Sequence, residues 1–129
     1  MARTGFVVDP SAILALLNEE AGADRVASCL RAAVVSTVSV VEVVTKLVDG
    51  RYPLDVAVKA VDALDMDEIA FDSPQARAAA QLATTAQGRA LSPRDRACLA
   101  LAHVTGRVAV TTGRAWARPE TSARIELAR

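Results

Sequence analysis

Short runs of apolar residues alternate along this chain with longer stretches in which apolar residues recur at helical spacing. The runs that predict strands are residues 6–8, 34–36, 69–71 and 108–111, with a further edge strand at 124–127. The helical stretches are residues 10–18, 21–32, 38–49, 53–64, 73–88 and 92–106, with a short helical piece around Trp116. Strands of three or four residues separated by helices are typical of a mainly parallel sheet covered on both faces. The pattern therefore predicts an α/β fold with a short-stranded central sheet.

Length and composition fit a single domain over residues 1–129. Of the 129 residues, 52% are hydrophobic, which is enough for one core. The longest apolar stretches fall far short of the roughly 20 residues of a membrane helix, and the first residues lack the apolar run of a secretory signal. Cys29 and Cys98 lack the spacing of a zinc site or a disulfide framework. We therefore expect a cytoplasmic protein with no membrane partner.

The net charge of zero hides an uneven distribution. Residues 1–76 carry 6 basic and 12 acidic side chains, whereas residues 77–129 carry 9 arginines and 3 acids. Arginine suits bidentate contacts with phosphate, although a compositional preference for arginine over lysine explains the same numbers. Because only 3% of the residues are aromatic, the chain offers no platform for stacking bases. A nucleic acid would therefore be held mainly through its backbone.

Three acidic residues lie near the predicted carboxyl ends of the strands, where open α/β sheets bind their ligands. Asp9 directly follows the first strand, Glu42 lies in the helix after the second, and Asp95 lies in the helix before the fourth. Each has a structural alternative. Asp9 is also a good helix N-cap, Glu42 can be an exposed acid paired with Lys46, and Asp95 can be a capping-box acid.

Gathered carboxylates repel one another unless a cation neutralises them. Mg²⁺ or Mn²⁺ fits best, because hard divalent ions prefer oxygen ligands and need neither histidine nor cysteine. We set His103 aside as a ligand, since it projects away from Asp95 around the same predicted helix. Such a site would polarise a phosphodiester and activate a bound water for in-line attack.

Four segments carry a family resemblance: they are residues 6–14 (FVVDPSAIL), 39–46 (SVVEVVTK), 91–102 (LSPRDRACLALA) and 110–116 (VTTGRAW). Together, in order and across essentially the whole chain, they resemble a PIN-domain ribonuclease of the VapC type, the toxin of VapBC toxin–antitoxin pairs. The resemblance implies a PIN-like α/β/α sandwich that cleaves single-stranded RNA with Mg²⁺ or Mn²⁺. It also implies a homodimer and a VapB-type antitoxin, whose basic or aromatic arm enters the acidic groove.

Asp9, Glu42 and Asp95 match the first three acids of that family, but Gly113 stands where the family usually has a fourth Asp. The glycine is either a natural variant or a change that disarms a toxin, and a turn requiring positive φ is the structural alternative. We expect metal binding to persist and catalysis to be weakened. The sequence therefore predicts a metal-dependent endoribonuclease toxin, and a catalytically eroded module that binds an antitoxin or dimerises is the alternative.

Three arginines are candidates for binding the RNA backbone, because they are the bases nearest Asp95 and the turn at residue 113. They are Arg94, Arg96 and Arg114. Arg94 and Arg96 can equally decorate a solvated helix face. A phospho-acceptor signalling domain is disfavoured, since the chain lacks the paired acids that such a domain carries after its first strand.

Overall fold

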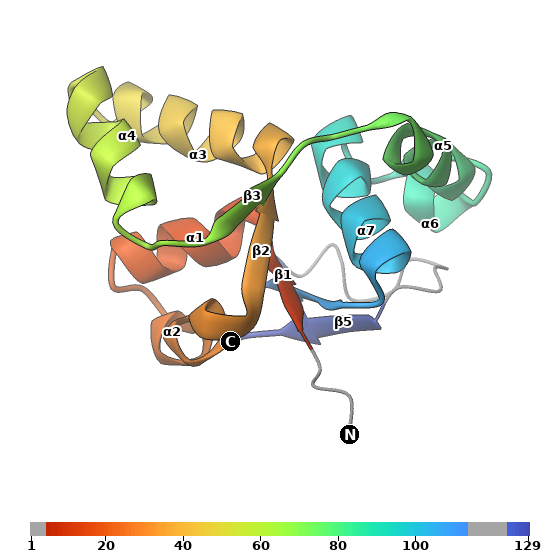
Figure 1. The fold of residues 1–129 in the computed structure, drawn as a ribbon, viewed down its shortest axis with the longest axis horizontal. Helices are drawn as coiled ribbons and strands as arrows, with labels where there is room; N and C mark the ends of the chain where they lie inside the picture. Colours follow the sequence, from red (N-terminus) through yellow and green to blue (C-terminus); the bar gives the residue numbers. More distant parts are fainter. Residues whose placement is uncertain (1–4, 114–123) are drawn as a thin grey trace.

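The computed structural model describes residues 5–113 and 124–129, which form a five-stranded sheet with helices on both faces (Figure 1). The strands are β1 (Phe6–Val8), β2 (Ala33–Ser36), β3 (Asp67–Ile69), β4 (Val108–Thr111) and β5 (Arg124–Leu127). The helices are α1 (Pro10–Leu17), α2 (Ala23–Cys29), the 3-10 turn η1 (Leu30–Ala32), α3 (Thr37–Asp49), α4 (Leu54–Asp62), α5 (Ser73–Leu82), α6 (Ala86–Arg89) and α7 (Pro93–Thr105). The predicted α/β fold is therefore confirmed.

All four strand pairings are parallel, and the order across the sheet is β3-β2-β1-β4-β5. After β1, the next two strands along the chain, β2 and β3, lie on one side of it, and β4 lies on the other side. The order in which strands are added to the sheet therefore reverses at β1. In open α/β sheets the crevice at such a reversal, at the carboxyl ends of the strands, is where ligands bind.

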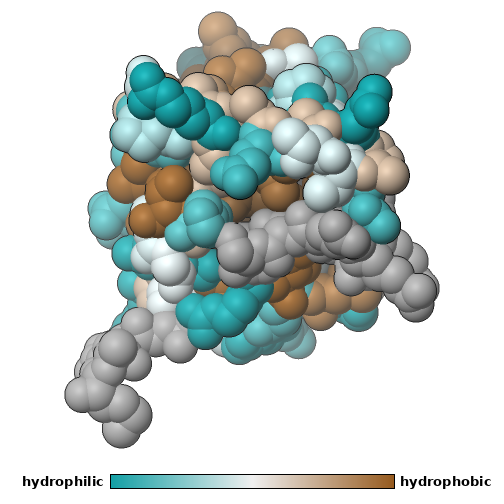
Figure 2. Space-filling view, turned by 90° about the vertical axis from the view of Figure 1, so that its right-hand side faces the viewer, coloured by the Kyte–Doolittle hydropathy of each residue, from teal (hydrophilic) through white to brown (hydrophobic). Residues whose placement is uncertain are grey.

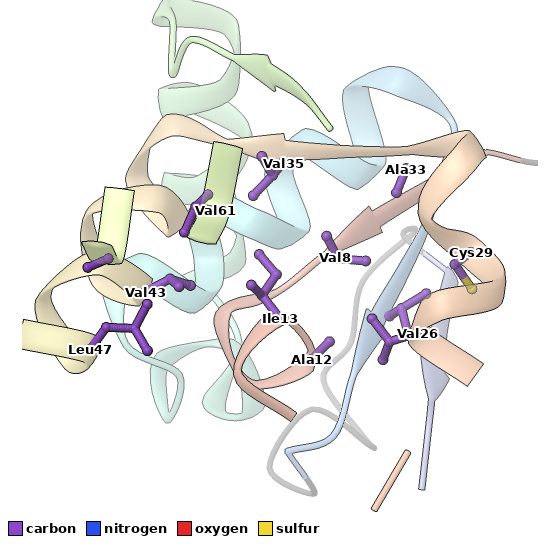
Figure 3. Packing of buried hydrophobic residues seen from close by; sticks show 12 residues of the cluster. Val8, Ala12, Ile13, Val26, Cys29, Ala33, Val35, Val43, Leu47 and Val61 are labelled. Atoms are coloured by element: carbon purple, nitrogen blue, oxygen red, sulfur yellow. The ribbon is translucent and has the colours of Figure 1, made fainter. Parts of the chain in front are cut away.

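The sheet separates two cores because alternate strand residues point to opposite faces. Helices α1–α4 cover one face and α5–α7 the other (Figure 1). Val8 and Val35 pack with Ile13 and Val43 in the first core (Figure 3). The second core is formed by Val7, Val34, Leu82, Leu91, Cys98, Leu99, Leu101, Ala102 and Ala109. The surface over the α5–α7 layer mixes hydrophilic and hydrophobic side chains (Figure 2).

The third strand lies two residues earlier than the predicted 69–71. The strand Asp67–Ile69 pairs with β2, with Val34 opposite Asp67 and Ser36 opposite Ile69. The prediction followed the apolar residues, but this edge strand is fixed by backbone pairing, and Asp67 and Glu68 are exposed. Ala70 and Phe71 instead lead into α5, and the carbonyl of Ala70 accepts a bond from the Gln75 side chain.

The helix predicted over 73–88 is divided in two. It ends at Leu82, and the short α6 begins after Thr85. The Thr85 hydroxyl accepts a hydrogen bond from the amide of Gly88 at 2.9 Å and thereby caps α6. Hydroxyl side chains that bond to nearby backbone groups compete with continuous helix, which explains the break.

The remaining elements lie close to their predicted positions, and β4 and the edge strand β5 have the predicted bounds. The helical piece predicted around Trp116 lies outside the described residues. No helix within 5–113 and 124–129 has the length and apolar character that crossing a membrane requires.

Candidate functional site

Asp9 lies at the carboxyl end of β1, directly beside β4. Its amide extends the ladder by donating to the carbonyl of Val110 at 3.1 Å, and its Oδ1 accepts from the amide of Ala12 at 2.7 Å. Asp9 is therefore the N-cap of α1, as the structural alternative proposed. Unlike a typical N-cap, however, Asp9 is buried, with only 3% of the residue exposed.

Two hydroxyl groups, those of Thr111 in β4 and Ser11 in α1, hold the Asp9 carboxylate. Thr111 Oγ1 donates to Oδ2 at 2.6 Å, and Ser11 Oγ lies 2.8 and 2.9 Å from the two oxygens. The hydroxyls are fixed in turn, since Ser11 Oγ accepts from the amide of Thr112 at 3.1 Å and Thr111 Oγ1 from the amide of Gly113 at 2.9 Å. The network joins β1, α1 and β4 around one acid.

Burial dominates the ionisation of Asp9 and raises its pKa from 3.8 to about 6. The bonds from Thr111, Ala12 and Ser11 oppose this rise because they stabilise the charged carboxylate, and the nearby charge of Asp95 adds to it. A bound cation would favour the ionised form of this carboxylate.

Glu42 extends from α3 towards the first turn of α7, where it meets Arg94. The Nε atom of Arg94 lies 2.6 Å from Oε1 of Glu42, and the two side chains are 59% and 14% exposed, respectively. The expected alternative, an exposed Glu42 paired with Lys46, is wrong, since the glutamate is largely buried and its ion pair reaches across to another helix.

Asp95 occupies the first turn of α7 and is half-buried. The cap of this helix is the Ser92 hydroxyl, which accepts from the Asp95 amide at 3.1 Å. Within the described part of the chain, no hydrogen bond or ion pair ends on the Asp95 carboxylate, so the reciprocal bond of a capping box is not made. As far as the described residues are concerned, the Asp95 carboxylate therefore has oxygen atoms available for a ligand.

The three acids lie within electrostatic range of one buried side chain, Cys98. Burial raises the pKa of the Cys98 thiol, and the charges of Asp9, Asp95 and Glu42 raise it further, in that order. The charges of Asp9 at the start of α1, Glu42 on α3 and Asp95 on α7 therefore all reach this one thiol.

The acids do not form a closed cage for an ion: no three of the His, Cys, Asp and Glu residues in 5–113 and 124–129 are grouped closely enough. Glu42 is instead paired with Arg94. The donor chemistry still fits a hard divalent ion, because Mg²⁺ is commonly held by one or two carboxylates together with water.

Gly113 follows β4 beside the hydroxyls that hold Asp9. The glycines with left-handed φ in the described ranges are Gly22 and Gly106, so the predicted alternative of a positive φ at Gly113 is wrong. A Cβ atom at this position would lie 3.4 Å from Thr111 Oγ1 and 3.9 Å from Ser11 Oγ, which is ordinary contact. A Cβ atom therefore fits at residue 113, and a side chain there would begin next to the partners of Asp9.

The candidate arginines have different environments. Arg94 is mostly exposed apart from its contact with Glu42, whereas Arg96 donates through one nitrogen to the carbonyls of Gly88 and Leu91 at 3.2 and 2.9 Å. Arg96 therefore stabilises the loop before α7 through these two hydrogen bonds. Arg114 lies outside the described residues.

A groove of about 550 Å³ lies between α3, α5 and α7, and its lining includes Arg94, the ion-pair partner of Glu42. Its walls are largely apolar and include Val38, Phe71 and the alanines of α5, with Arg94 and Arg96 supplying positive charge. This combination suits a ligand that has both an apolar and an anionic part.

Sequence reasoning missed the roles of Ser11 and Thr111. A signal for Thr111 exists, because a parallel pairing of the first and fourth strands that sets Val8 beside Val110 also sets Asp9 beside Thr111. The sequence signal for Ser11 is weaker, because a serine near the start of a helix is common.

The PIN domain model matches residues 6–121. Because this match covers most of the 129 residues, the chain belongs to the PIN domain family. No curated protein matches it in sequence.

Solved structures share the fold. A DNA-bound VapBC from Salmonella typhimurium is 17% identical, with 96% of this chain and 98% of that chain covered and a TM-score of 0.74. VapBC2 from Rickettsia felis, bound to a DNA fragment from its promoter, is 12% identical, with 94% and 96% covered and a TM-score of 0.73. VapBC-5 from Mycobacterium tuberculosis is 20% identical, with 96% and 97% covered and a TM-score of 0.64. The PIN-like sandwich predicted from the sequence is confirmed.

Proposed function

We propose that this PIN domain, spanning residues 1–129, is a VapC-type toxin of a type II toxin–antitoxin pair and cleaves RNA phosphodiesters as a divalent-metal-dependent endoribonuclease. The observation that carries the proposal is the buried Asp9 carboxylate at the switch point of the sheet, where the charge of Asp95 reaches it and where Glu42 contacts the first turn of the same α7 helix through Arg94. Family membership supports a nuclease, and the VapBC structures of the same fold support the toxin assignment.

Asp9 and Asp95 are proposed as the main ligands of Mg²⁺ or Mn²⁺, with Glu42 at the edge of the same site. When bound, such an ion polarises a phosphodiester and lowers the pKa of its bound water. The hydroxyls of Thr111 and Ser11 fix the direction of the Asp9 carboxylate and oppose its protonation. Hard oxygen donors suit both ions, so the ligand chemistry supports either.

RNA is proposed to lie in the groove between α3, α5 and α7. The exposed guanidinium of Arg94 suits a backbone phosphate, which agrees with an RNA held mainly through its backbone. Arg96 contributes positive charge from a fixed position, and Arg114 remains a proposed phosphate contact on the basis of sequence alone. The free, buried state of Cys29 and Cys98 suits the reducing cytoplasm, where such RNA is found.

A VapB-type antitoxin and a second copy of this chain are the proposed protein partners. The antitoxin rests on the VapBC complexes of the same fold. The homodimer is supported by exposed apolar side chains of α3, of α4 and of the turn between them, which together we call the α3–α4 patch: Val41, Val48, Tyr52, Leu54, Val56 and Val58.

The test is cleavage of a single-stranded RNA with and without Mn²⁺ or Mg²⁺. Asp9→Asn and Asp95→Asn should each lower the rate by about a hundredfold, because each removes a charged ligand. Asp49→Asn, an exposed acid at the end of α3, should leave the rate unchanged. Cleavage that needs no divalent ion, or that survives Asp9→Asn, would contradict the proposal.

Gly113 favours a second candidate, a catalytically eroded PIN module that acts through its partners. The two are separated by Gly113→Asp, whose side chain would begin beside Ser11 and Thr111. Under the main proposal this variant cleaves RNA faster than the parent chain. An eroded module instead shows no turnover in either form while still binding its antitoxin.

A further inference from the structure

The ion pair between Glu42 and Arg94 joins two very different environments. The glutamate side chain is 14% exposed and is held on α3, whereas the arginine side chain is 59% exposed on the first turn of α7. Nε of the arginine lies 2.6 Å from Oε1 of the glutamate. The carboxylate is therefore the fixed member of the pair, and the arginine is the member that can leave into water.

A largely buried carboxylate needs a compensating positive charge, because a lone charge loses its hydration without replacement. Within the described ranges, the ion pair that Glu42 makes is the one with Arg94. Arg94 thus supplies to Glu42 the positive charge that a metal ion would otherwise supply. It does so next to Asp95, whose own carboxylate receives no bond from the described residues.

We propose that Arg94 is a displaceable counter-ion built into the chain, which competes with the divalent ion for Glu42 and leaves that carboxylate when the ion binds. This inference rests on the proposed function, since it concerns the same cation site. It also agrees with the absence, in the described residues, of three acids close enough together to hold an ion. The released guanidinium stays at the wall of the groove, where an RNA phosphate is the anion it would meet.

The test is the dissociation constant of Mn²⁺, measured calorimetrically without RNA, for a double-mutant cycle of Arg94→Gln and Glu42→Gln. Arg94→Gln should tighten Mn²⁺ binding about fivefold, as expected for loss of a partly exposed competing ion pair. In the Glu42→Gln background the same change should have less than about a twofold effect. Because a positive charge is unfavourable at a helix N-terminus, Arg94→Gln should not weaken α7.

Arg51→Gln is the matched control. It removes the same charge from an exposed arginine just beyond the far end of α3, whose last residue lies about 10 Å along the helix from Glu42. Its Mn²⁺ affinity should equal that of the parent chain. Equal tightening in Arg51→Gln, or equal tightening with and without Glu42, would overturn the inference, because the effect would then be a general one of charge.

The remaining outcomes separate this inference from the proposed function. If the parent chain binds Mn²⁺ and Arg94→Gln binds it with the same affinity, the inference is overturned and the metal site stands. If only Arg94→Gln binds Mn²⁺, the inference is supported in its strongest form. If no variant binds Mn²⁺, both proposals fail.

Discussion

The position of Asp9 has two opposite effects on its charge: the N-cap role favours the ionised form, and burial disfavours it. As the cap of α1 it accepts bonds best when ionised, but among the described residues it is the one charged side chain that is buried. Burial outweighs the bonds and raises its pKa to about 6. At neutral pH the chain therefore holds an ionised carboxylate at a cost in stability, which a cation at the site would relieve.

This cost predicts a pH dependence of stability. Between pH 4 and 6 the folded state binds more protons at Asp9 than the unfolded state does, so the contribution of Asp9 to stability falls as the pH rises through this window. The rise from 3.8 to about 6 corresponds to at most about 3 kcal/mol. Asp9→Asn has no titrating carboxylate at this position and should lack this loss. As the pH rises from 4 to 7, its free energy of unfolding should therefore increase relative to that of the parent, as measured by urea unfolding without divalent ions.

Asp49→Asn serves as the control, because Asp49 is exposed and should leave the pH profile of the parent intact. A profile for Asp9→Asn that runs parallel to that of the parent would show that Asp9 ionises normally in the folded chain.

At the scale of elements, most boundaries follow from local chemistry that the sequence displays. Asp or Ser followed by proline marks the starts of α1 and α7, and Gly106 ends α7. The two larger errors arise where local chemistry is weak. The edge strand β3 is placed by pairing with β2 rather than by apolar residues, and the break after α5 depends on the hydroxyl of Thr85.

Gly106 gives the element-scale prediction. It ends α7 with φ +67°, and a Cβ there would meet no atom within 4 Å. Gly106→Ala should therefore cost about 1 kcal/mol through backbone strain alone. Gly113→Ala, whose φ is not left-handed and whose Cβ has room, should change the free energy of unfolding by less than about 0.5 kcal/mol. Equal losses in the two variants would contradict this interpretation.

At the scale of the whole molecule, the sequence predicted that Asp9, Glu42 and Asp95 lie together because parallel strands present their carboxyl ends at one edge. The side chains that contact these acids could not be predicted from the order of strands and helices. The Glu42–Arg94 contact crosses from α3 to α7, and local spacing favoured Lys46 instead. The role of Thr111 required the register of β1 against β4.

The α3–α4 patch gives the prediction for assembly. Leu54 is 63% exposed at the start of α4, where an acidic residue is compatible with the helix N-terminus. Leu54→Asp should leave the melting temperature nearly unchanged but weaken self-association by at least about tenfold in sedimentation equilibrium.

Val104→Asp is the control for assembly, since Val104 is also exposed but lies on α7 in the opposite layer. Its self-association should match that of the parent chain. A Leu54→Asp variant that associates as strongly as the parent would exclude the α3–α4 patch as the dimer surface.

The most direct test of the central proposal is anomalous diffraction from crystals of the chain grown with Mn²⁺. We predict a peak within bonding distance of the carboxylates of both Asp9 and Asp95, at the carboxyl ends of β1 and β4. Strong Mn²⁺ peaks elsewhere on the molecule, with none between these two acids, would contradict the account.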